Sequence, residues 1–156
     1  MTPLAGHRFA LFAYGFRPFF LLAGLYAAGS IAAWVWLFPR GATSMSSLLP
    51  QLWHGHEMIF GFIAAAIAGF MLTAVPNWTG KRGLSGRPLI VLTGLWLAGR
   101  VAFGVGDALP IEVLVVAELS FVPGVVIVLA PSIIRSSNRN WPLLLVLFAF
   151  WCGDAV

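Results

Sequence analysis

The sequence predicts an all-α protein, a polytopic bundle of transmembrane helices with four full spans and a truncated fifth. Of its 156 residues, 60% are hydrophobic and 9% are charged. A soluble domain is about 45–50% apolar and about 25% charged. The hydrophobic residues also form long uninterrupted blocks, and a helix needs about 20 mainly apolar residues to cross a bilayer. We therefore expect a single membrane domain over residues 1–156, with the lipid bilayer as its surroundings.

The apolar blocks define the expected helices. They predict helices at about 16–38, 56–75, 88–106, 111–134 and 141–156. The second helix should end before Pro76, because the residue before a proline is disfavoured in the helical region. Pro88 suits the first turn of the third helix, where its missing N–H costs nothing. The fifth helix is short for a span, so we expect the chain to be the N-terminal part of a longer protein.

Basic residues are expected to orient these helices. Most of the nine Lys and Arg residues lie before the first block, after the second or after the fourth. They are Arg8, Arg17, Lys81, Arg82, Arg87, Arg135 and Arg139. Because such loops stay on the cytoplasmic side, the N-terminus is predicted to be cytoplasmic. This topology accounts for the net charge of +4 without a nucleic-acid partner.

Two of the three histidines lie in the segment His54-Gly55-His56-Glu57, at the head of the second helix. Neutral imidazole binds metals and can be an axial ligand of haem, so both histidines are candidate ligands of a metal or haem. Residues two apart on a helix point about 200° apart, so both can bind one ion only if Gly55 is unwound. Met58 is a possible soft copper ligand, and Glu57 would support the ligands or handle protons. Alternatively, the histidines only hydrogen-bond to a neighbouring helix or to water.

A stripe of small residues continues from His54 and Met58 along the same helix. Gly61, Ala65 and Gly69 follow at four-residue spacing. Small residues let a neighbouring helix approach closely in a membrane. We therefore expect His54 and Met58 to lie at the end of a buried packing face, and His56 to point elsewhere.

Arg100 and Glu118 are charged residues within the expected third and fourth spans. Charges inside a span usually pair or line a functional cavity. Each lies nine residues from Leu109, near the turn between the two helices, so an antiparallel hairpin brings them to the same depth. We expect an intramembrane ion pair, either as a structural clamp or as part of one polar site with His54 and Glu57.

Several motifs in this order resemble the NnrS family. They are Gly15-Phe16-Arg17-Pro18-Phe19-Phe20, Trp53-His54-Gly55-His56-Glu57-Met58, Gly69-Phe70-Met71-Leu72-Thr73-Ala74-Val75-Pro76-Asn77-Trp78-Thr79-Gly80 and Leu95-Trp96-Leu97-Ala98-Gly99-Arg100. The resemblance implies a multi-pass protein of the bacterial inner membrane that contains haem and copper. It implies a role in denitrification, the nitric oxide response and protection against nitrosative stress. Nitric oxide or an iron-nitrosyl species, and the remainder of the full-length chain, are the implied partners, whereas the reaction and any enzymatic activity stay open.

A membrane transporter or transport-associated protein without a redox metal is the main alternative. It would use His54, Glu57, Arg100 and Glu118 as a proton- or anion-binding site, since buried charges of this kind are common in transporters. A structural assembly factor, whose polar residues only hold helices together, is a third possibility.

Overall fold

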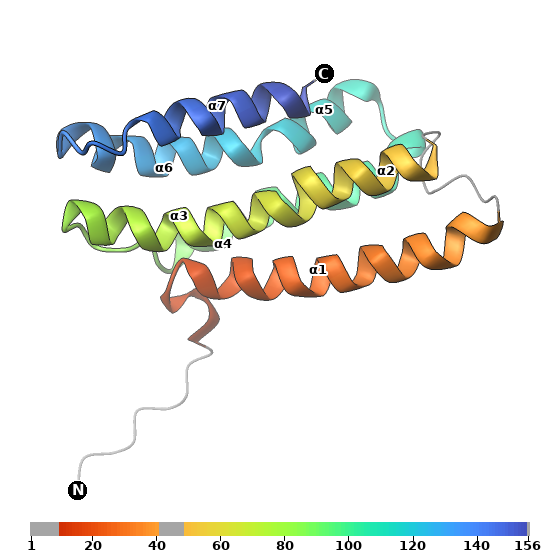
Figure 1. The fold of residues 1–156 in the computed structure, drawn as a ribbon, viewed down its shortest axis with the longest axis horizontal. Helices are drawn as coiled ribbons and strands as arrows, with labels where there is room; N and C mark the ends of the chain where they lie inside the picture. Colours follow the sequence, from red (N-terminus) through yellow and green to blue (C-terminus); the bar gives the residue numbers. More distant parts are fainter. Residues whose placement is uncertain (1–9, 41–48, 156) are drawn as a thin grey trace, which may run out of the picture.

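The structure is a computed structural model that describes residues 10–40 and 49–155. Over these residues it consists of helices and short connections, and long helices that follow one another along the chain run in opposite directions (Figure 1). The main helices are α1 (Phe16–Leu37), α2 (Pro50–His56), α3 (Ala64–Thr79), α4 (Arg87–Gly104), α5 (Ile111–Leu119), α6 (Phe121–Arg135) and α7 (Pro142–Asp154). A π-helical segment, Glu57–Ile63, joins α2 to α3 without a break. Short 3-10 turns occupy Ala10–Ala13, Phe38–Arg40 and Gly106–Ala108.

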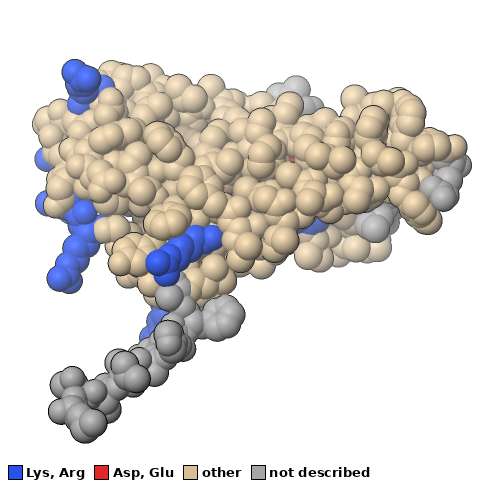
Figure 2. All heavy atoms as spheres, turned by 60° about the horizontal axis from the view of Figure 1, so that its bottom comes forward, with Lys and Arg blue, Asp and Glu red and all other residues tan. Residues whose placement is uncertain are grey.

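Three helices are long and apolar enough to cross a membrane. They are Phe16–Leu37, Pro50–Thr79 and Ile111–Arg135. Large hydrophobic side chains such as Leu25, Val116 and Ile127 lie exposed on them, as expected of surfaces that face lipid. Lys and Arg gather mainly toward one end of the molecule, and a long surface with few charged atoms extends beyond them (Figure 2). The predicted all-helical membrane class is therefore confirmed. Arg8, one of the basic residues expected to orient the helices, lies outside the described residues.

The second span is longer than the predicted range of 56–75. It begins at Pro50, which occupies the first helical turn, where a proline costs no hydrogen bond. It also continues through Pro76, so the prediction that it ends before this proline is wrong. Pro76 lies in the last turn of α3, and Val75 before it is fully buried and helical. The helix ends at Gly80, which donates to the Pro76 carbonyl and whose left-handed backbone (φ 64°) lets the N–H of Lys81 bond the same carbonyl at 3.2 Å.

Residues 111–135 form one long apolar helix, as predicted for 111–134, but its regular hydrogen bonding is broken at one residue. It consists of α5 and α6, which meet at Ser120. Pro123 has no N–H to donate to the Leu119 carbonyl four residues earlier. The Trp151 indole of α7 donates to this carbonyl at 2.9 Å instead. The break therefore creates a point at which α7 is attached to the fourth span.

The small-residue stripe packs against α1, as expected. A side-chain carbon at Gly69 would lie 3.1 Å from the ring of Phe20, and one at Gly61 would lie 2.7 Å from the ring of Tyr26. Ala65 between them is fully buried. Glycine at these two positions thus sets the distance between the second span and α1, and it brings Tyr26 next to the charged residues described below.

Candidate functional site

The π-helical segment Glu57–Ile63 lies directly after the two histidines. A π-helix is wider than an α-helix, and such segments occur frequently at functional sites. The indole of Trp96, on α4, donates a hydrogen bond to the Gly61 carbonyl at 3.0 Å. Trp96 is buried and its ring meets that of Tyr26 edge-on, with the centroids 5.3 Å apart. These contacts hold the widened turn against both α1 and α4.

His54 lies in an aromatic, uncharged environment on the α1 side. Its ring stacks on Trp34, with centroids 4.7 Å apart and planes 20° apart. Nδ1 of His54 and Nε1 of Trp34 are buried and have no hydrogen-bond partner among the described residues. Gly55 is helical, so His54 and His56 contact different helices.

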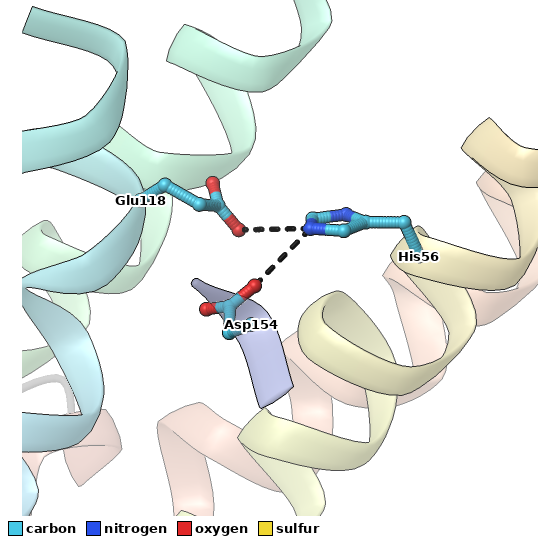
Figure 3. A group of neighbouring side chains, drawn as sticks. All are labelled: His56, Glu118 and Asp154. Atoms are coloured by element: carbon cyan, nitrogen blue, oxygen red, sulfur yellow. Dashed lines mark hydrogen bonds and ion pairs between the residues drawn. The ribbon is translucent and has the colours of Figure 1, made fainter. Parts of the chain in front are cut away.

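His56 lies instead in a charged environment. Its ring stacks on Phe103 of α4, with centroids 4.0 Å apart and planes 12° apart. Its Nε2 atom is 3.1 Å from Oδ1 of Asp154 and 3.9 Å from Oε1 of Glu118 (Figure 3). Its Nδ1 atom faces Oε1 of Glu57 at 3.7 Å. Side chains from α4, α5, α7 and the π-helical segment therefore meet at this imidazole.

Arg100 links the carboxylates of this region. Its Nη1 atom donates to Oε2 of Glu57 at 2.9 Å, and its Nη2 atom donates to Oε1 of Glu118. The predicted ion pair between Arg100 and Glu118 is therefore present, with Glu57 as an additional partner. The Tyr26 hydroxyl also donates to Oε2 of Glu57. Glu57, Arg100 and Glu118 are 1%, 8% and 6% exposed, so the ions are removed from solvent.

We call these six side chains the polar centre. It comprises Tyr26, His56, Glu57, Arg100, Glu118 and Asp154. The centre contains three carboxylates and one guanidinium, so its net charge is −2 when all four are ionised and His56 is neutral. Buried charge is costly unless it is compensated. The centre is therefore suited to taking up positive charge, as protons or as a cation.

Three members of the polar centre are arranged to hold a metal ion. His56, Glu118 and Asp154 each offer one ligand atom, and these atoms lie within 4.8 Å of one another. A cavity of about 130 Å³ lies beside them, lined also by Phe103. The predicted group of His54, His56 and Met58 is not brought together in this way, because Gly55 is helical and His54 faces Trp34. Their roles as individual ligands stay predictions.

Two members of the polar centre were not singled out from the sequence. Asp154 is one of only five acidic residues and ends an apolar block, which is a signal for a buried charge. Tyr26 is one of two tyrosines and lies in the middle of an uncharged apolar block. Nothing in the sequence pattern pairs either residue with His56 or Glu57, since both contacts depend on how distant helices pack.

The family model for the NnrS protein matches residues 10–156. The chain belongs to the NnrS family. The match includes every residue of the polar centre and agrees with the membrane character of the three long apolar helices. Comparison with curated proteins and with solved structures finds no match for this chain.

The haem and copper expected from the resemblance do not fit the donors that converge in this NnrS chain. The cavity beside His56 measures about 130 Å³, whereas pockets for small organic ligands measure about 300–1,000 Å³. Copper in its reduced state favours thiolate, thioether and imidazole ligands. Two of the three converging ligands here are carboxylates. The polar centre is therefore neither a haem pocket nor a soft copper site.

Proposed function

We propose that this NnrS chain contributes a buried proton- or cation-binding centre to a multi-pass protein of the bacterial inner membrane. The protein would act in the nitric oxide response, in denitrification and in protection against nitrosative stress. The polar centre is the observation that carries the proposal, because it places three carboxylates, a guanidinium and an imidazole inside an apolar bundle. Ionisable side chains within a membrane domain are costly and usually functional.

The proposal includes α4 as a fourth crossing of the membrane. Arg100 is the charge that opposes insertion of this helix, and its contacts with Glu57 and Glu118 compensate that charge within the bundle. The N-terminus would be cytoplasmic, because Lys81 and Arg135 follow or end the helices at the same end of the bundle. The polar centre would then lie in the outer half of the membrane.

Haem and copper belong to the proposal only as groups that the family resemblance implies. They would need ligands other than the set that converges on His56. No step of the proposed role depends on either group. The polar centre supplies a buried site at which protons or cations bind within the membrane domain.

Survival of bacteria under nitric oxide tests the proposed function. A strain that lacks its own copy of the protein would carry full-length wild type, Asp154→Asn or Glu118→Gln, with protein amounts in the membrane matched by immunoblot. Both changes remove a carboxylate while keeping side-chain shape, so we expect survival to fall, because loss of a proton-transfer group typically lowers a rate by about 100-fold or more. Glu112→Gln is the matched control, because Glu112 is an exposed carboxylate at the start of α5. Wild-type survival in both test strains would contradict the proposal.

A proton-coupled transporter without a redox metal is the second candidate. The excess of carboxylates over cationic groups favours a proton over an anion as the coupled ion. If this candidate is correct, purified protein in vesicles takes up its solute in a way that depends on acidification. Asp154→Asn would lose this uptake. Absence of uptake by the wild-type protein would rule it out in favour of the first proposal.

A further inference from the structure

We propose that His56, Glu118 and Asp154 bind one divalent metal ion of the Fe²⁺, Mn²⁺ or Zn²⁺ class. This site is distinct from a haem or a soft copper site, and it uses the polar centre on which the proposed function rests. Its ligands come from α2, α5 and α7, which are far apart in the sequence. The ion would therefore join three spans of the membrane domain.

The positions of the ligand atoms suit coordination of a single ion. Atoms bound to one ion at about 2.1 Å lie roughly 3–4 Å from one another. Nε2 of His56 lies 3.1 Å from Oδ1 of Asp154 and 3.9 Å from Oε1 of Glu118. Figure 3 shows that both carboxylates point at this nitrogen from neighbouring helices. All three ligand atoms lie within 4.8 Å of one another, so a metal ion could bind among them after the side chains shift, with Oε1 of Glu118 also retaining or releasing Arg100.

The surroundings of His56 resemble those that orient metal-binding histidines. Such a histidine usually directs its second ring nitrogen toward a carboxylate, a carbonyl or water. Nδ1 of His56 lies 3.7 Å from Oε1 of Glu57, which is longer than a hydrogen bond, and Glu57 is itself held by Arg100 and Tyr26. The stacked ring of Phe103 restrains the imidazole plane. Nε2 is thus the nitrogen presented to the two ligand carboxylates.

The polar centre contains more acidic than basic side chains. Its three carboxylates exceed its single guanidinium by two when His56 is neutral. A divalent cation would bring the net charge to zero without protonating a carboxylate. The side chains of Glu118 and Asp154 are each 5% exposed, so solvent gives them little compensation.

The cavity next to the ligands can complete the coordination. It measures about 130 Å³ and is lined by His56, Glu118 and Asp154. A water molecule occupies about 30 Å³ in the liquid. Water or a small exogenous molecule could therefore fill the positions that three protein ligands leave open.

The donor set favours divalent metal ions over Cu⁺. Carboxylate oxygens suit Mn²⁺, and imidazole suits Fe²⁺ and Zn²⁺, whereas thioether or thiolate is the preferred donor for Cu⁺. The competing explanation is that a protonated His56 simply bridges Asp154 and Glu118 as an ion pair. The two explanations differ in one measurable respect, namely whether a divalent ion binds with an affinity that depends on all three side chains.

Cobalt binding to the purified full-length protein tests the inference. The protein would be stripped with a chelator in detergent and titrated with Co²⁺, whose visible absorption reports nitrogen and oxygen coordination, and Zn²⁺ would be added as a competitor. We expect one ion per chain in the wild type, displaced by Zn²⁺. His56→Gln and Asp154→Asn should each weaken binding by at least about 100-fold. His54→Gln and Glu112→Gln should bind as the wild type does.

Circular dichroism and size-exclusion chromatography of each variant would establish that it is folded. Glu118→Gln also loses a partner of Arg100, so Asp154→Asn is the decisive variant, because Asp154 contacts His56 without an ion pair to Arg100. Absence of binding to the wild type, or equal binding by folded Asp154→Asn and wild type, would overturn the metal site. A third outcome is that survival under nitric oxide depends on Asp154 but the protein binds no cobalt. This outcome would overturn the metal site alone and leave the proposed function standing.

Discussion

His54 and His56 are separated by one residue, yet they lie in opposite chemical environments. His54 stacks on Trp34 of α1, in a region without charged partners among the described residues. His56 stacks on Phe103 of α4 and faces the carboxylates of Asp154, Glu118 and Glu57. The helix separates the two rings because Gly55 stays helical. The two histidines of such a motif in a membrane helix therefore have to be assigned their roles separately.

Of the substitutions that distinguish the two histidines, removal of Arg100 should have the largest effect. It disrupts the ion pairs near His56 and leaves the surroundings of His54 unchanged. Arg100→Met leaves Glu57 and Glu118 buried without their cation, and breaking a buried pair in this way costs about 3–5 kcal/mol. We expect a lower melting temperature in detergent and less folded protein in the membrane. Arg87→Met, at the exposed start of α4, is the matched control and should melt as the wild type does. A melting temperature of Arg100→Met equal to that of the control would show that the ion pairs contribute little.

Substitution of the rings that stack on His56 and His54 should have a smaller effect, and it compares the two histidines directly. Phe103→Leu removes the ring against His56, and Trp34→Leu removes the ring against His54. Aromatic pairs contribute about 0.5–1.5 kcal/mol beyond buried area, which corresponds to roughly a 2- to 10-fold change in affinity. We expect Phe103→Leu to weaken Co²⁺ binding within this range and Trp34→Leu to leave it unchanged. Equal weakening by both changes would mean that the effect is general loosening of the bundle.

Much of the charged side follows from the sequence by simple geometry. Arg100 and Glu118 lie at equal distances from the turn near Leu109, so an antiparallel hairpin has to bring them together. Helical spacing likewise separates His54 from His56. Long apolar blocks predict the helices themselves, because a bilayer requires them.

The remaining features depend on contacts between distant helices. The π-helical turn at Glu57–Ile63 is stabilised by the indole of Trp96, which no local propensity predicts. Asp154 reaches His56 only because α7 packs on the interrupted fourth span, where the Trp151 indole bonds the carbonyl that Pro123 leaves free. The contact between Asp154 and His56 therefore depends on how the helices pack. The sequence shows only that an acidic residue is present at this position.

Survival under nitric oxide in strains that carry His54→Gln or His56→Gln tests the central claim most directly. The same substitution is made at two positions of one motif, with equal amounts of full-length protein in the membrane. The account predicts that His56→Gln loses protection and that His54→Gln retains it, because only His56 belongs to the polar centre. Loss of protection in His54→Gln together with full protection in His56→Gln would contradict the account and place the function on the α1 side.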